Sequence, residues 1–234
     1  MLKYDDFIEK VNDAGFLTPF TNYIDPEIFT FACEGNNPKG QNYTGDPETD
    51  PTIWAKRAAE EKKLAYGCFF NGKTGGYIAP RFYSLFTDAF RPRMTVEERY
   101  KSGKLGEYEW KVWTVLDKNN GSVSWSQIWQ YHGIKDEAER RKLDAALKNL
   151  QMTFDIAISG CVRGLNKNGT DFNFMGYQKS ADWVPQEWLA MNTRMEHGEA
   201  LEIIYRQAEK ISSSGDEKKA FAKSLKLYKS FTEI

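Results

Sequence analysis

One segment of the sequence matches a phosphate-binding pattern. Residues 67–74 read GCFFNGKT, which satisfies the pattern G-x-x-x-x-G-K-[ST]. In nucleotide hydrolases this loop opens directly into a helix, whose first backbone amides bind the phosphates. Here the loop interior holds two phenylalanines, and the next residues, 75–78, read GGYI, a run typical of a strand. The sequence context therefore favours a β-hairpin turning at Asn71-Gly72 over a nucleotide site.

Histidine and cysteine chemistry finds little support in the sequence. The chain has two histidines, His132 and His197, and three widely spaced cysteines, Cys33, Cys68 and Cys161. They form no Cys-x-x-Cys pair, no zinc-ligand spacing and no signature of a nucleophile with its base. We therefore expect reduced thiols in a cytoplasmic protein, with no metal and no cofactor.

The chemistry that the sequence favours is binding of DNA phosphates by cations. The candidate contacts lie in one predicted helix and in the hairpin that follows it: Arg140, Arg141, Lys142, Lys148, Arg163 and Lys167. A helix beside a hairpin tip can follow the backbone of duplex DNA and place cations on its phosphates. The alternative is a solvated helix face, on which Glu139 and Asp144 partly neutralise the same cations.

The pattern of residues 105–178 predicts a winged helix-turn-helix that positions these cations. Apolar spacing predicts helices over 106–118, 125–132 and 136–151, the second of them capped by Ser124. The period then changes, and alternating apolar residues predict two strands, which join through a polar, glycine-rich tip over 160–169. The last helix of such a module commonly enters the major groove of DNA.

The regions on either side of this module are also expected to fold. In residues 1–104 we predict a β-hairpin over 64–79 and an ordered, aromatic-rich loop over 16–49, together with helices over 4–14, from 51, 81–90 and from 95. This content is compatible with a second, degenerate winged-helix unit. Residues 179–234 are predicted to form a C-terminal helical segment, with helices over 185–191, 196–211 and 217–231. The predicted fold class is α+β and mainly helical.

Composition limits the partners. The net charge of −1 argues against a histone-like or coat-type nucleic-acid binder, and 41% hydrophobic content is enough for a real core. Residues 1–60 contain five Lys/Arg and eleven Asp/Glu, while the rest of the chain contains 27 and 22. Because residues 1–60 are acidic, we expect DNA contact through the mildly basic remainder of the chain. No apolar run approaches the ~18 residues that a membrane helix needs, so we expect no membrane partner.

Three stretches carry a family resemblance. They are the TGDPETDP of residues 44–51, followed by Trp54 and Arg57; the AYGCFFNGK of 65–73; and the LQMTFDIAISG of 150–160. The chain resembles the bacterial AlkZ-related proteins, a branch near the AlkZ/YcaQ winged-helix DNA glycosylases, over roughly residues 1–190. The resemblance implies tandem winged-helix units around a DNA-binding channel.

The same resemblance raises the question of catalysis. AlkZ-type enzymes excise alkylated bases with a Gln-x-Gln motif whose glutamines position the hydrolytic water. This sequence has no Gln-x-Gln, and its closest approach is Gln127 and Gln130, which have two residues between them rather than one and lie on a different element. We therefore expect first a non-catalytic DNA-binding protein, either a regulator or a repair-associated factor. The alternatives are a base-excision enzyme with a different polar pair, and a protein-interaction module that uses the aromatic residues of 124–132.

Overall fold

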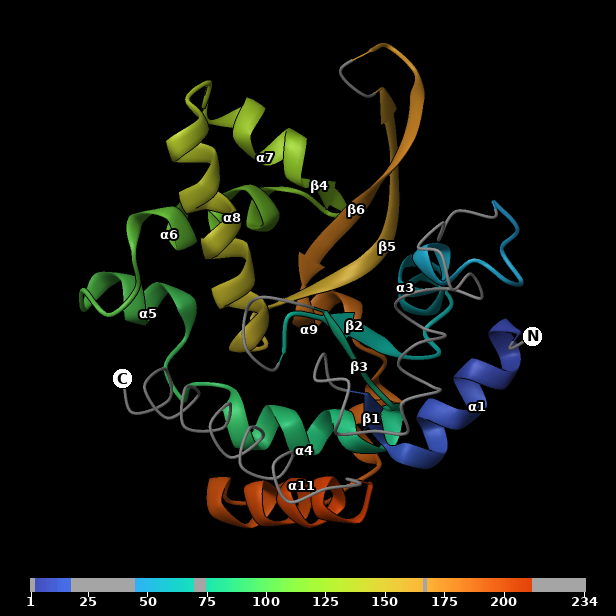
Figure 1. The fold of residues 1–234 in the computed structure, drawn as a ribbon. Coiled ribbons are helices and arrows are strands. Elements are labelled where there is room, and N and C mark those ends of the chain that lie inside the picture. The colour runs from blue at the N-terminus through green and yellow to red at the C-terminus, as the bar shows by residue number, and fades with distance from the viewer. Residues whose placement is uncertain (1–2, 18–44, 70–74, 166–167, 212–234) are drawn as a thin grey trace.

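The computed structural model describes residues 3–17, 45–69, 75–165 and 168–211 (Figure 1). It shows an α+β chain that is mainly helical, as the sequence predicts, and its described residues form two small antiparallel sheets of three strands each. None of the described helices is long and apolar enough to cross a membrane. The Asn71-Gly72 turn, the helix predicted over 217–231 and almost all of the loop predicted over 16–49 lie outside the described residues.

The elements follow the predicted order closely. The N-terminal part contains α1 (Tyr4–Ala14), β1 (Phe16–Leu17), α3 (Pro51–Glu60), β2 (Ala65–Gly67), β3 (Gly76–Ile78), α4 (Pro80–Phe90) and α5 (Val96–Lys101). The middle part contains α6 (Glu107–Lys118), β4 (Val123–Ser124), α7 (Trp125–Tyr131), α8 (Glu137–Met152), β5 (Ile156–Leu165) and β6 (Asp171–Lys179). The C-terminal part contains α9 (Ser180–Trp183), α10 (Gln186–Ala190) and α11 (His197–Ile211).

Side-chain caps explain where several helices begin. Thr95 accepts a hydrogen bond from the amide of Glu98 at 3.2 Å, and the Glu98 carboxylate accepts one from the Thr95 amide at 2.8 Å. Ser124 and Gln127 form the same reciprocal box at the start of α7. At the start of α8, the Asp136 carboxylate accepts from two backbone amides. These bonds satisfy amides that lack a partner within the helix, so the predicted starts are confirmed.

The described side chains form two hydrophobic cores. One joins α1, α3, the β1–β3–β2 sheet and α4 to α11, and it is rich in aromatic contacts, such as Phe7 stacked on Trp54 at 5.0 Å. The other lies among α6, α7 and α8. Figure 1 shows α4 and α11 side by side at one end of the molecule, with the α6–α8 group above them and the β5–β6 hairpin rising between that group and α3. Phe154, between α8 and β5, is fully buried in the first core, so the two parts pack as one body.

The two sheets have the same topology. In each, the first strand pairs with the third and the third with the second, in the orders β1-β3-β2 and β4-β6-β5. The order of the described elements is also similar, because in each part a helix and a two-residue strand come before further helix and then two antiparallel strands. Residues 70–74, the loop of the phosphate-binding pattern, lie outside the described residues. The residues after it form strand β3 rather than a helix, which agrees with the predicted hairpin.

The pH dependence of stability tests the burial of Lys62 against Trp183. Lys62 follows α3 in a left-handed conformation (φ 56°), its ammonium donates to the Trp183 carbonyl at 2.6 Å, and burial lowers its pKa from 10.5 to about 8. Between about pH 8 and 10.5 the unfolded chain therefore binds more protons at this lysine than the folded chain does, so stability should rise with pH there. Replacing Lys62 with methionine should remove that rise. Urea unfolding at pH 7 and pH 10 should show the wild type gaining relative to the variant, and an unchanged difference would contradict the assignment.

Candidate DNA interface

Arg140 points onto α7 rather than out to solvent. Its guanidinium carbon lies 3.7 Å from the centre of the Trp129 ring, and the side chain is half-buried. Trp129 packs in turn against Trp125, with ring centres 4.8 Å apart. Stacking fixes the direction of the guanidinium, so Arg140 can reach a ligand only beside α7.

The other cations of α8 are mostly paired within the helix. Lys148 lies 2.8 Å from Asp144, and Arg141 lies 3.6 Å from Glu137, both pairs one turn apart. Lys142 sits 5.5 Å above the ring of Tyr108. A phosphate approaching this face would meet Glu137 and Asp144 as well as the cations, so α8 alone is a weak anion site.

The hairpin presents a cation that is not paired with a described carboxylate. Arg163 is exposed on β5 opposite Asn173 of β6, and it forms no ion pair with any residue that the structure describes. Lys56 of α3 lies beside the hairpin, because its ammonium donates a hydrogen bond to the carbonyl of Asn173 at 2.8 Å. Burial raises the pKa of the Cys161 thiol, and Glu60 raises it further, while Lys56 and Arg163 act to lower it. Lys167, the second cation predicted at the tip, lies outside the described residues.

A tight contact holds the hairpin against α3. At Gly160 the strand pairing shifts register, and the backbone adopts φ +128°. A β-carbon at this position would lie 2.8 Å from the β-carbon of Glu60. Glycine therefore allows both the bend and the close approach, and together these bring Lys56 beside the outer half of the hairpin.

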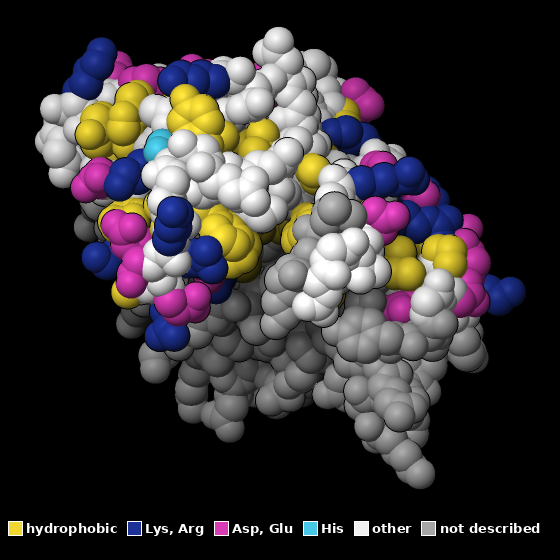
Figure 2. Space-filling view, turned by 90° about the horizontal axis from the view of Figure 1, so that it is seen from above, with side chains coloured by type: hydrophobic (Ala, Val, Ile, Leu, Met, Phe, Trp, Pro, Cys, Tyr) yellow, Lys and Arg dark blue, Asp and Glu magenta, His cyan; other side chains and the backbone are white. Residues whose placement is uncertain are grey.

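The outer half of the hairpin also exposes aromatic surface. Phe172 is 50% exposed, and its ring packs edge-on against Phe174 with centres 4.9 Å apart. Lys56 lies 5.7 Å from the centre of the Phe172 ring. Seen from the hairpin end, the molecule shows Lys/Arg and Asp/Glu side chains interspersed rather than one large basic patch (Figure 2). Anion binding on this face therefore depends on local groups such as Lys56 and Arg163.

The sequence profile of the AlkZ-related family matches residues 1–226. The chain belongs to the AlkZ-related family. No curated protein and no solved structure gives a significant match to it.

Within this AlkZ-related chain, Gln127, one glutamine of the nearest approach to Gln-x-Gln, and the buried Gln151 both make structural hydrogen bonds. Gln127 caps α7 through its bond to the amide of Ser124. The buried Gln151 donates to the carbonyl of Leu147 and accepts from the amide of Cys68, at 3.0 Å in each case. Neither amide is therefore presented as part of a pair to a substrate.

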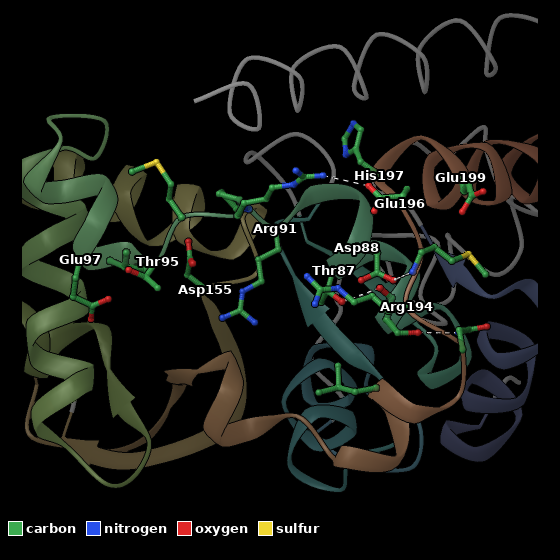
Figure 3. A pocket seen from close by; sticks show the side chains of 18 of the residues that line it. Thr87, Asp88, Arg91, Thr95, Glu97, Asp155, Arg194, Glu196, His197 and Glu199 are labelled. Atoms are coloured by element: carbon green, nitrogen blue, oxygen red, sulfur yellow. Dashed lines mark hydrogen bonds and ion pairs between the residues drawn. The ribbon is translucent and has the colours of Figure 1, made fainter.

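A large concavity of about 1600 Å³ lies between the end of α4, the start of α5 and the start of α11 (Figure 3). Its lining includes three arginines and five carboxylates: Arg91, Arg93, Arg194, Asp88, Glu97, Asp155, Glu196 and Glu199. Several of these are engaged, since Arg93 pairs with Glu196 at 3.2 Å and Asp88 accepts from the amide of Met195 at 2.9 Å. Among the described lining residues carboxylates outnumber arginines, which disfavours contact with a DNA backbone at this surface.

Asp155, on the wall of this concavity, is the most deeply buried of its carboxylates. It accepts from Thr153 and forms an ion pair with Arg99, and the side chains of Arg99 and Asp155 are each only 4% exposed. The pair ties α5 to the start of β5. Its position inside the protein indicates a structural role.

Proposed function

We propose that residues 105–178 form a winged helix and that the β5–β6 hairpin is its wing. The order α6, β4, α7, α8, β5, β6, with β4 pairing the last strand, supports this assignment. The matching topology of the N-terminal sheet supports a second, degenerate unit in residues 1–104. Membership in the AlkZ-related family agrees with a tandem arrangement.

We propose that the protein binds duplex DNA chiefly through the wing and α3. The observation that carries the proposal is the placement of Arg163 on a projecting hairpin with Lys56 of α3 beside it, where neither cation pairs with a described carboxylate. Residues 105–178 contain as many Asp/Glu as Lys/Arg, so their total charge gives no attraction of its own. Local cations are then the source of phosphate binding. The remaining predicted cations would contact DNA phosphates secondarily, after the wing has bound. They are Arg140, Arg141, Lys142, Lys148 and Lys167.

Substitution of Arg163 tests this proposal. Replacing Arg163 with glutamine should weaken binding to a fluorescent duplex by several fold and reduce the salt slope by about 1, because one phosphate contact is lost. Replacing Arg141 should have a smaller effect, since Glu137 offsets its charge. Fluorescence anisotropy across a salt series measures both quantities.

Arg93 provides the matched control. It is an exposed arginine whose side chain is 90% accessible, and it pairs with Glu196 beside the carboxylate-lined concavity. Arg93→Gln removes the same charge at a place without a proposed DNA contact. Equal losses from the Arg163 and Arg93 variants would show that only net charge matters and would overturn the assignment of the wing.

A further inference from the structure

The exposed aromatic pair on the hairpin is built by the strand register. Gly164 of β5 faces Phe172 of β6, and Val162 faces Phe174, so these four residues share one face of the ribbon. A β-carbon on Gly164 would lie 3.2 Å from the Phe174 ring. The missing side chain therefore lets Phe174 lie across β5 and support Phe172 from one side.

The position of this pair distinguishes it from ordinary exposed apolar side chains. A single exposed apolar residue on a surface needs no explanation. Here two aromatic rings adjoin on a hairpin that projects from the body (Figure 1), and Phe172 remains 50% exposed. Lys56 lies beside the ring, whereas Arg163, opposite Asn173, points to the other face of the ribbon. A flat apolar surface with a cation beside it complements a nucleobase attached to its phosphate.

We propose that Phe172 and Phe174 form a stacking platform for an unpaired base of DNA. The inference rests on the proposed DNA binding and adds a substrate class to it. In an intact duplex the base faces are covered by their neighbours, so the platform has nothing to stack on. In a duplex with an extrahelical or unpaired nucleotide one face is free, and Lys56 lies where it can hold the adjoining phosphate.

The test compares two duplexes of equal length, one fully paired and one with a single bulged thymine, at the same salt concentration. The wild type should bind the bulged duplex about 5- to 100-fold more tightly, in the range expected for one base stacked on an aromatic ring. Phe172→Ala should reduce that preference to near 1 and leave affinity for the paired duplex unchanged. Phe172→Trp should preserve it, whereas Phe172→Leu, which keeps apolar volume but lacks a ring, should lose it.

Tyr131 supplies the control, because it is an aromatic residue of similar exposure, 53%, on α7 away from the hairpin. Tyr131→Ala should leave the preference intact, and circular dichroism of each variant checks its folding. Equal binding of both duplexes by the wild type would overturn the platform and leave the proposed duplex binding standing. An equal loss on both duplexes in Phe172→Ala would also overturn it. Absence of binding to either duplex would overturn both proposals.

Discussion

Replacing Asp155 with alanine should lower the free energy of unfolding by about 3–5 kcal/mol. The substitution leaves the guanidinium of Arg99 buried without its counter-charge, since both side chains are 4% exposed and paired with each other. It also removes the acceptor for the hydroxyl of Thr153. Urea denaturation followed by tryptophan fluorescence measures the loss, provided that the m-value stays unchanged.

An exposed pair on the same protein gives the comparison. Glu196→Ala breaks the ion pair with Arg93, whose two side chains are 90% and 80% accessible, and it should change stability by less than about 1 kcal/mol. Asp155→Ala with Arg99→Met should recover part of the loss, because the isolated buried charge is then gone. A loss below about 1 kcal/mol from Asp155→Ala alone would contradict the role assigned to this pair.

The second large effect is expected at Gly160. Replacing it with alanine should cost at least about 2 kcal/mol, because an L-residue is strained at φ +128° and its β-carbon would press on Glu60 of α3. The hairpin would also move away from α3 and separate Lys56 from Arg163. DNA affinity of the still-folded fraction should therefore fall together with stability.

Gly169 separates strain from contact. It also has a positive φ, +75°, but a β-carbon there meets nothing within 4 Å. Gly169→Ala should cost only the backbone strain and leave the hairpin against α3. If the two substitutions have the same effect on stability and on DNA affinity, then the contact with Glu60 does not position the hairpin.

Local signals account for the parts of the fold that the sequence predicts well. Reciprocal caps at Thr95 and Ser124 fix helix starts within one turn of chain, and apolar spacing identifies α1, α6, α8 and α11 to within a residue or two. The short elements β1, β4 and α9 were not predicted as such. Strands of two residues and a helix of four are too short to show a period, and partners distant in sequence define them.

The candidate site, in contrast, depends mainly on contacts that the sequence does not predict. The cations of α8 are evident in the sequence, yet their availability to a phosphate depends on their contacts with Trp129, Glu137 and Asp144. Only the structure shows which cation contacts which of these residues. Lys56 was missed because it lies more than 100 residues before Asn173, the residue that it contacts. Phe172 was assigned only to an alternating strand. Its exposure depends on how far the hairpin projects, which alternation does not report.

The most direct test of the account is binding of the wild-type protein to a fluorescent duplex over a salt series. If Arg163, Lys56 and the secondary cations contact phosphates, the logarithm of the association constant should fall linearly with the logarithm of salt concentration, with a slope between about −2 and −5. Absence of binding at low salt, or binding that does not change with salt, would contradict the proposal that this protein holds DNA through its wing.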